Sequence, residues 1–197
     1  MIKCKNKDAP SEVKIAIHKI LQEHFICRFL PQGWIAGGAI RSRIANDGKS
    51  DWDCYFTSES DLQASLALIL SSNITAAIKT NDEHLVSISS TIGKIDLVRK
   101  FYTNPVDTLL DFDFTVCCFA MDNDNWFYYL PQAITDLKAK KLVLYNPRDG
   151  LSSMMRLQKY ATKGYTMEFV EHQKLADLIK NKPFDETVKR MAGRPGY

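Results

Sequence analysis

The chain has 197 residues, of which 45% are hydrophobic and 25% charged, a composition typical of one globular domain with a sizeable core. The formal net charge of +3 is compatible with phosphate or nucleic-acid partners without requiring them. The first ten residues lack the apolar core of a secretory signal, and no apolar run approaches the about 20 residues that cross a bilayer. We therefore expect a cytoplasmic protein without a membrane segment.

Cysteine usage points to a reducing environment. The five cysteines are odd in number and lack C-x-x-C spacing, which disfavours both a disulfide framework and a structural zinc site. We expect free, buried thiols at Cys4, Cys27, Cys54, Cys117 and Cys118.

Local patterns in the first third of the chain predict alternating helices and strands. Ser11 can cap an amphipathic helix that runs to about Cys27. The stretch GWIAGGAI predicts a short strand that ends in a double glycine, after which a helical pattern resumes. DWDCYFTS predicts a second strand, and Ser58 or Ser60 can cap the apolar helix that follows it.

The later segments predict a hairpin, further strands and a helical end. HLVSISSTIG and KIDLVRKF alternate apolar and polar residues around a glycine, as hairpin strands do. Asp96 therefore falls on a strand expected to lie beside the strand of Asp51 and Asp53. Residues 111–121 fit helix and strand equally well, NWFYYL and KKLVLYN predict strands, and two helices are expected from about Asp149.

Three carboxylates on neighbouring strands raise one another's pKa unless a positive charge lies among them. Asp51 and Asp53 are two residues apart and point the same way from a strand, so they could supply the oxygen ligands that Mg²⁺ prefers, with Asp96 as the third. Simpler explanations exist for each residue. A D-x-D is commonly a surface turn, and Asp96 could pair with Lys94 or Arg99.

The double glycine upstream fits a phosphate site. Gly37 and Gly38 let the backbone approach a phosphate closely, and the helix that begins there would direct free N–H groups toward it. Arg41, one turn into that helix, could add a charge-assisted contact. The alternatives are a tight turn and a solvated helix charge.

The order and spacing of these motifs match a known family. GGAIRSRIANDGKSDWDCYF resembles the signature of class II CCA-adding enzymes and bacterial poly(A) polymerases, of the DNA polymerase beta superfamily, whose pattern is G-G-x-V-R-D, a short helix and D-x-D. Later segments of the same family resemble IDLVRKFYTNP, DFDFTVCCFAMD, ITDLKAKKLVLYNP and SSMMRLQKYATKGYTM. The colinear match covers about residues 34–167.

The resemblance implies an α+β fold, in which a mixed sheet packed by helices forms a catalytic head over residues 1–147. A helical neck-like segment, shorter than that of the family, is implied for residues 148–197. The implied activity is a nucleotidyltransferase dependent on Mg²⁺ or Mn²⁺, which binds an NTP and transfers NMP to a hydroxyl acceptor with release of pyrophosphate. The implied acceptor is an RNA 3′ end, of tRNA or another RNA.

By resemblance, catalysis and metal binding are assigned to Asp51, Asp53 and Asp96. Nucleotide binding is assigned to Gly37, Gly38, Arg41, Arg99, Asp113 and Arg156.

Three departures from the family pattern bear on the substrate. Ser42 replaces the aspartate of V-R-D, Asp111-Phe112 replace a pair of arginines, and Ser152-Ser153 replace the Glu-Asp that selects CTP or ATP. The expected effects are a weaker glycine turn, more negative charge in the nucleotide pocket and redirected base choice. A protein or small-molecule acceptor, or a non-catalytic relative that binds nucleotide or RNA, stays open, as does the oligomeric state.

Overall fold

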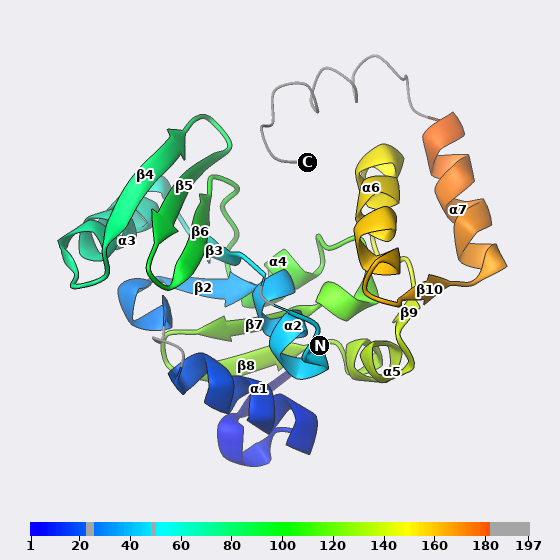
Figure 1. Ribbon diagram of the computed structural model, residues 1–197, viewed down its shortest axis with the longest axis horizontal. Helices are drawn as coiled ribbons and strands as arrows, with labels where there is room; N and C mark the ends of the chain where they lie inside the picture. The colour runs from blue at the N-terminus through cyan, green and yellow to red at the C-terminus, as the bar shows by residue number, and fades with distance from the viewer. Residues whose placement is uncertain (23–25, 49, 182–197) are drawn as a thin grey trace.

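The computed structural model describes residues 1–22, 26–48 and 50–181, and its centre is an eight-stranded mixed sheet in the order β1-β8-β7-β2-β3-β6-β5-β4 (Figure 1). The strands are β1 (Ile2–Lys5), β2 (Gly33–Ala36), β3 (Trp52–Phe56), β4 (Ala76–Asn81), β5 (Leu85–Ser90), β6 (Gly93–Val98), β7 (Phe119–Asp122) and β8 (Trp126–Tyr129). A separate parallel pair joins β9 (Lys141–Leu142) to β10 (Thr166–Met167).

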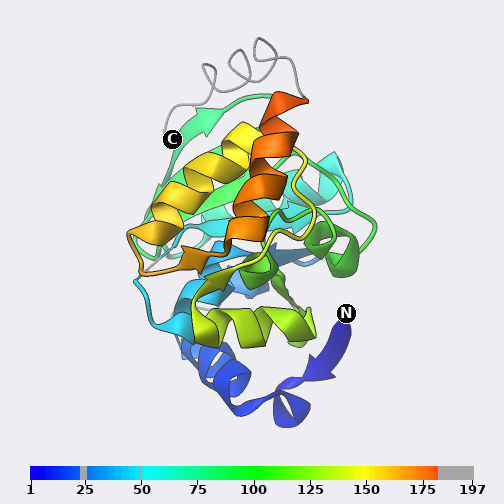
Figure 2. The same cartoon turned by 90° about the vertical axis from the view of Figure 1, so that its right-hand side faces the viewer.

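The helices are α1 (Ser11–Gln22), α2 (Gly38–Ala45), α3 (Glu59–Ser71), α4 (Pro105–Leu109), α5 (Pro131–Ala139), α6 (Gly150–Ala161) and α7 (Phe169–Lys180). Short 3₁₀ turns cover Asn6–Asp8, Ile26–Phe29 and Thr115–Cys117. Near the C-terminus α6 and α7 lie side by side (Figure 2). The expected α+β class, with a mixed sheet followed by a helical segment, is confirmed.

Strand β3 separates two apolar cores because its side chains alternate between the faces of the sheet. Trp52, Cys54 and Phe56 are buried in the larger core, which α1 and α3 complete with side chains such as Ile17 and Leu62. The opposite face carries Asp53, Tyr55 and a smaller core built from Trp34, Ala36, Leu109, Ala120 and Tyr128. A shift of one residue in the register would bury the carboxylate of Asp53 in the larger core, so the alternation fixes the pairing.

Strand β6 lies parallel to β3 and antiparallel to β5. The expected hairpin around Gly93 is present as β5 and β6, with Gly93 at a φ of +109°. In the parallel pairing Asp53 is the Cα partner of Asp96. This register is what brings carboxylates from distant parts of the sequence to one face of the sheet.

Several boundaries differ from the sequence prediction. The first helix is described over Ser11–Gln22, and residues 23–25 lie outside the described residues. It does not continue to Cys27, because the chain forms a 3₁₀ turn at Ile26–Phe29. KKLVLYN forms only the two-residue strand β9, followed by a single bridge between Leu144 and Phe114. The ambiguous segment 111–121 divides into a 3₁₀ turn and the start of β7.

Two further local features concern the ends of elements. The lysine-rich N-terminus, for which no element was predicted, adds β1 to the sheet edge by pairing with β8. Ser58 is the N-cap of α3 and its hydroxyl accepts a hydrogen bond from the Asp61 N–H at 3.2 Å. Of the two predicted caps, Ser58 is therefore the one used, and the Ser60 alternative is wrong.

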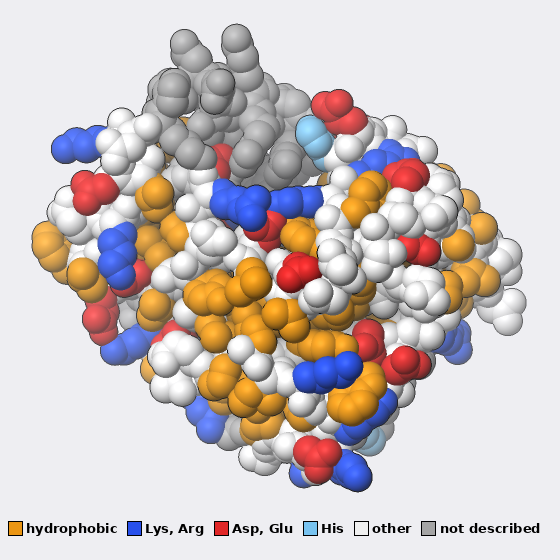
Figure 3. Space-filling view, turned by 180° about the vertical axis from the view of Figure 1, so that it is seen from behind, with side chains coloured by type: hydrophobic (Ala, Val, Ile, Leu, Met, Phe, Trp, Pro, Cys, Tyr) orange, Lys and Arg blue, Asp and Glu red, His pale blue; other side chains and the backbone are white. Residues whose placement is uncertain are grey.

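No helix among the described residues is long and apolar enough to cross a membrane. Some large hydrophobic side chains are nevertheless exposed, including Phe169 and Val170 on α7 and Met154 on α6. Seen from behind, hydrophobic side chains gather near the middle of the molecule, beneath a group of Lys and Arg side chains (Figure 3). Exposed apolar area of this kind is common on globular proteins.

Candidate active site

The three predicted carboxylates lie at one end of the β3–β6 pair. Asp53 and Asp96 are register partners on the two parallel strands, and Asp51 immediately precedes β3. The Asp96 side chain is 10% exposed, whereas the Asp51 side chain is 53% exposed. The exposure of the carboxylates therefore increases from Asp96, which is buried on β6, to Asp51, which is solvated just before β3.

Lys94 lies between two of these carboxylates. Its Nζ is 2.8 Å from Oδ2 of Asp96 and 3.3 Å from Oδ2 of Asp51. The other oxygen of Asp96, Oδ1, accepts a hydrogen bond from the hydroxyl of Ser87 at 2.6 Å. The pairing of Asp96 with Lys94, one of the two alternatives from the sequence, is the one present.

The electrostatics of the site centre on Asp53. Burial, followed by the negative charges of Asp96 and Asp51, raises the pKa of Asp53 to about 7. Lys94 and Lys159 on α6 act in the opposite direction without cancelling that rise. Burial also acts to lower the pKa of Lys94, but the hydrogen bond to Asp96 and the two carboxylate charges outweigh it and raise the pKa. The carboxylates thus stabilise the charged form of Lys94, but the positive charge near them does not balance their negative charge.

This donor set fits a hard divalent cation chemically, because carboxylate oxygens are its preferred ligands. Among the residues that the structure describes, however, no group of three or more His, Cys, Asp or Glu side chains is arranged to hold a metal ion. The ammonium of Lys94 lies where it contacts both Asp51 and Asp96. The cluster in this structure is therefore three carboxylates together with one lysine.

The glycine turn lies between β2 and α2, and β2 is the neighbour of β3 in the sheet. Gly37 has a φ of +78°, and a Cβ built on it would lie 3.2 Å from the ring of Phe112. Glycine is thus favoured both by conformation and by space. The N–H of Gly37 is already used, since it donates to the carbonyl of Phe119 at 2.9 Å.

The partners of the Arg41 side chain are Asp47, Tyr160 and Tyr165 rather than the three carboxylates. Its side chain is 1% exposed and forms an ion pair with Asp47. The guanidinium also donates to the hydroxyl of Tyr165 at 3.1 Å and stacks over the ring of Tyr160, 5.0 Å from its centroid. Asp47 thereby gives Arg41 a carboxylate partner within the same segment, although Ser42 replaces the family's aspartate.

The substituted pair Asp111-Phe112 lies beside the glycine turn. Asp111 is paired with Lys100 and Arg148 and accepts a hydrogen bond from the hydroxyl of Tyr102. Burial acts to raise the pKa of Asp111, but these donors and charges outweigh it and lower the pKa. The negative charge that Asp111 adds at this position is thus balanced by Lys100 and Arg148 and hydrogen-bonded by Tyr102.

Phe112 builds an aromatic wall next to Asp53. Its ring meets Tyr55 edge to face at 6.3 Å, and Tyr55 meets Tyr102 in the same way at 6.0 Å. Tyr55 lies two residues after Asp53 on the same face of β3. Burial and the charge of Asp53 raise the pKa of Tyr55, and Arg156 opposes the rise. The carboxylates are thus bordered by aromatic rings on the side of the glycine turn.

Asp113 and Arg156 are brought together by α6. Arg156 Nη1 is 2.7 Å from Oδ2 of Asp113, and the hydroxyl of Ser153 donates to the same oxygen at 3.1 Å. Ser152 instead donates to Asp149, the N-cap of α6, at 2.9 Å. The two serines that replace the family's acidic pair therefore have structural hydrogen-bond partners.

Arg99 lies apart from this constellation. Its Nε is 3.3 Å from Glu59 of α3, and Nη1 donates to Asn81 at 2.9 Å. These contacts tie the end of β6 to α3 and to the β4–β5 edge. Of the nucleotide-binding residues implied by the resemblance, Arg41 and Arg99 form ion pairs with Asp47 and Glu59 rather than with the three carboxylates. Asp113 instead pairs with Arg156 of α6.

Two residues of the site could have been assigned a role from the sequence. Lys94 is two positions before Asp96, so strand periodicity places both on one face. Ser87 faces Asp96 once the hairpin is closed around Gly93, because the register follows from the turn. Lys159 carried no such signal, since its effect on Asp53 depends on how α6 docks.

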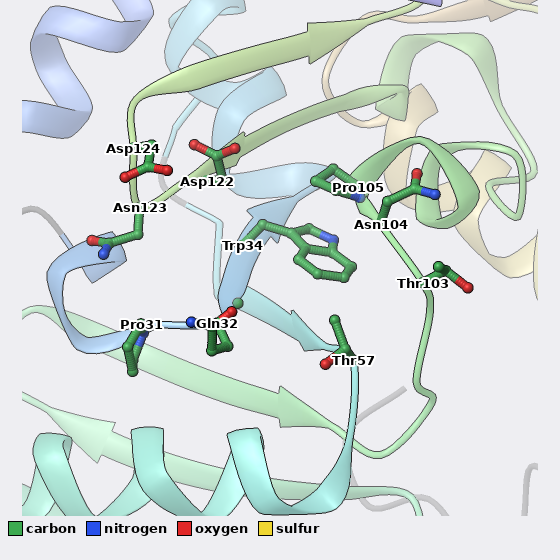
Figure 4. Close-up of a pocket in the computed structure, with 11 residues that line it drawn as sticks. Pro31, Gln32, Trp34, Thr57, Thr103, Asn104, Pro105, Asp122, Asn123 and Asp124 are labelled. Atoms are coloured by element: carbon green, nitrogen blue, oxygen red, sulfur yellow. The ribbon is translucent and has the colours of Figure 1, made fainter.

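A separate hollow of about 200 Å³ opens at the opposite end of β2 (Figure 4). Its lining includes Trp34, Thr57, Asn104 and Asp122. The indole N–H of Trp34 donates to Thr108 at 3.0 Å, and both oxygens of Asp122 accept hydrogen bonds from β8. The principal polar groups of this hollow are thus engaged within the protein.

Comparison with known proteins places the chain in a family. The model of the Gabija anti-defense 2 family matches residues 10–140, which is more than half of the chain. The chain belongs to the Gabija anti-defense 2 family. A curated protein named Gabija anti-defense 2, from Bacillus phage SPbetaL7, is 28% identical over 169 residues, which cover 82% of this chain and 42% of that protein.

Solved structures similar to this Gabija anti-defense 2 family member include CCA-adding enzymes. The Thermotoga maritima enzyme complexed with tRNA has a TM-score of 0.61 at 13% identity, and the match covers 91% of this chain and 46% of the enzyme. A CCA-adding enzyme with CTP has a TM-score of 0.62 at 14% identity, with 96% and 48% covered. The nucleotidyltransferase-like fold implied by the resemblance is confirmed, but the family is Gabija anti-defense 2 rather than CCA-adding. The chain spans less than half the length of these relatives.

Proposed function

We propose that the chain is a metal-dependent nucleotidyltransferase that transfers NMP from an NTP to a hydroxyl acceptor. The observation that carries the proposal is the parallel register of Asp53 and Asp96, with Asp51 beside them and the pKa of Asp53 raised to about 7. Carboxylates kept this close without a full complement of cations suggest a function beyond packing, because their repulsion destabilises the fold. The nucleotidyltransferase-like fold supports the same activity.

In the proposed reaction an acceptor hydroxyl oxygen attacks the α-phosphorus of the NTP. The bond from that phosphorus to the bridging oxygen of the β-phosphate breaks, pyrophosphate leaves, and the hydroxyl proton passes to the carboxylate of Asp96. Asp51 and Asp53 would hold Mg²⁺ or Mn²⁺, which when bound supplies positive charge to the triphosphate. Arg156, on α6 beside Asp113, would neutralise charge on the nucleotide.

The proposed first acceptor is an RNA 3′ end. The similar structures include CCA-adding enzymes in complexes with tRNA, CTP and ATP. The family name links the chain to phage counter-defence against Gabija, and we infer that the nucleotidyl transfer serves that role. A protein hydroxyl is the alternative acceptor within the same chemistry.

The deciding experiment incubates the full chain with each of the four α-labelled NTPs, Mg²⁺ or Mn²⁺, and total bacterial RNA. RNA, protein and small-molecule products are then resolved. We expect label in RNA, and its complete loss in Asp51→Ala and Asp53→Ala, whose melting temperatures stay equal to or above that of the wild type because carboxylate repulsion is relieved. Lys79→Gln, an exposed substitution on β4, is the control that retains incorporation. Label in protein alone would contradict the RNA acceptor but not the reaction type.

A second candidate is a non-catalytic nucleotide-binding protein. The specific observation in its favour is that Arg41 is 1% exposed and pairs with Asp47, so that its charge is already engaged within the protein. Nucleotide binding in equilibrium dialysis, without incorporation of any of the four labels into any product, would establish this candidate and exclude the enzyme.

A further inference from the structure

Lys94 is the cation that the structure itself supplies to the carboxylate cluster. We propose that its ammonium group takes the place of one of the two metal ions of a two-metal site, so that the protein binds a single divalent cation, held by Asp51 and Asp53. This inference rests on the proposed function for its chemistry, and it concerns how many metal ions the site binds. Two-metal sites place two divalent cations a few ångströms apart to stabilise both the attacking and the leaving oxygen.

Both oxygens of the Asp96 carboxylate already have partners within the protein. One carboxylate oxygen accepts a hydrogen bond from Ser87 at 2.6 Å, and the other is 2.8 Å from the ammonium of Lys94. The Asp96 side chain is only 10% exposed. The remaining lone pairs of its two oxygens therefore face a crowded part of the protein. Ligation of a metal ion by Asp96 would therefore require Lys94 to move away.

The position of Lys94 beside Asp96 follows from the backbone of the β5–β6 hairpin. Lys94 and Asp96 are two residues apart on β6, so their side chains project from the same face. The β5–β6 register pairs Ser89 with Lys94 and Ser87 with Asp96. The closed hairpin thus fixes the backbone position of Lys94, and the 3.3 Å contact of its ammonium with Asp51 reaches across to the chain before β3.

The charges of the cluster also favour a single divalent cation. Asp51, Asp53 and Asp96 carry three negative charges when ionised, and Lys94 with one divalent cation carries three positive charges. A second divalent cation would leave the cluster with excess positive charge before any nucleotide binds. Asp53 is the member in contact with neither Ser87 nor Lys94 among the described hydrogen bonds and ion pairs. The remaining cation site therefore falls between Asp53 and the solvated Asp51.

Lys94 acts on the reaction through this placement as a positioning residue. Its ammonium holds Asp96 in place beside the position of the acceptor hydroxyl and lowers the negative charge that the hydroxyl oxygen would otherwise meet there. The single metal ion at Asp51 and Asp53 is left to serve the triphosphate.

The test counts bound Mn²⁺ on the full chain by electron paramagnetic resonance, in which the signal of free Mn²⁺ falls on binding, without nucleotide or RNA. We expect one Mn²⁺ per wild-type chain, one for Lys94→Arg, which keeps the charge, and two for Lys94→Gln, which frees Asp51 and Asp96. The double variant Lys94→Gln with Asp96→Asn should return to one. Lys79→Gln, matched in chemistry but on the β4 edge, should keep one.

Two Mn²⁺ on the wild type, none on the wild type, or the same number on Lys94→Gln as on the wild type overturns the inference. If Lys94→Gln does not fold, Asp96→Asn alone decides, because it keeps one Mn²⁺ only when Asp96 is not a ligand. The count is independent of turnover. A protein that binds one Mn²⁺ but incorporates no NMP keeps this inference and loses the proposed function, whereas an active protein with two Mn²⁺ does the reverse.

Discussion

At the scale of single residues, the main electrostatic cost lies at Asp53. Its pKa in the folded protein is about 7, compared with an ordinary value of 3.8. Between these two values the folded state binds more protons than the unfolded state, so stability falls as the pH rises from about 4 to about 7 and stays low above that range. The difference corresponds to at most about 4 kcal/mol at about 1.4 kcal/mol per pKa unit.

Asp53→Asn removes this titration while keeping the shape of the side chain. In buffer with a chelator, the variant should be more stable than the wild type at pH 8, by up to about 4 kcal/mol, and should differ little near pH 4. Urea denaturation at a series of pH values measures the difference. Asp107→Asn on α4, at a distance from the cluster, is the control that should not reproduce the effect. A wild-type advantage at pH 8 would show that Asp53 is not strained by its neighbours.

The sequence predicted the placement of the carboxylates and missed that of Arg41, for a physical reason. Asp51, Asp53 and Asp96 lie on strands whose period and hairpin turn can be inferred locally. The partner of Arg41 within its own segment is Asp47, but its partners Tyr160 and Tyr165 come from the C-terminal part of the chain, Tyr165 being 124 residues away. Only the docking of the C-terminal helices closes this network, and no local pattern encodes docking.

At the scale of elements, the contact between α6 and α7 depends on a glycine. A Cβ built on Gly150, the first residue of α6, would lie 2.7 Å from Cγ1 and 3.0 Å from the backbone nitrogen of Ile179 on α7. The nitrogen belongs to a helix backbone and cannot rotate away. The close approach, rather than an unusual φ, requires glycine here.

Gly150→Ala should therefore separate the two helices, with a loss of about 1–3 kcal/mol, the range typical of overpacking. Hydrogen exchange measured by mass spectrometry should show faster exchange in Phe169–Lys180 and unchanged exchange in β3 and β6. Gln158→Ala, on the exposed side of α6, is the matched control and should leave α7 protected. Unchanged protection of α7 in Gly150→Ala would contradict the packing.

Element prediction succeeded where a local signal was strong and failed where tertiary contacts decided. Ser58 caps α3 as its residue type and position suggest. KKLVLYN has strand composition, but β10 offers only two residues for pairing, so β9 stops at Leu142. Strand β1 is lysine-rich and forms because β8 provides a partner, with Lys3 and Lys5 lying over the ring of Trp126.

At the scale of the whole molecule, α6 is joined to the sheet assembly by polar and aromatic contacts together. The ring of Tyr160 meets Phe114 at 5.9 Å and Tyr165 at 5.5 Å, and its hydroxyl is 2.8 Å from the thiol of Cys117. On either side, Arg156 pairs with Asp113 and Arg41 stacks on Tyr160. The helical segment and the sheet therefore share one core, although residues 148–197 were predicted to form a unit of their own, a division that stays a prediction.

Because the helical segment and the sheet share this core, the reactivity of the cysteine thiols reports when the core opens to solvent. All five thiols are free and buried, and burial raises the pKa of Cys117 to about 11, so at pH 8 a native thiol is both covered and protonated. A chromogenic disulfide reagent should modify none of the five in the native protein and all five in denaturant. Tyr160→Ala removes the cover of Cys117, and one thiol should then react rapidly while the other four stay protected. Met155→Ala, on the exposed side of α6, should behave as the wild type. Simultaneous exposure of all five thiols in Tyr160→Ala would mean that α6 stabilises the entire fold rather than only its own docking surface.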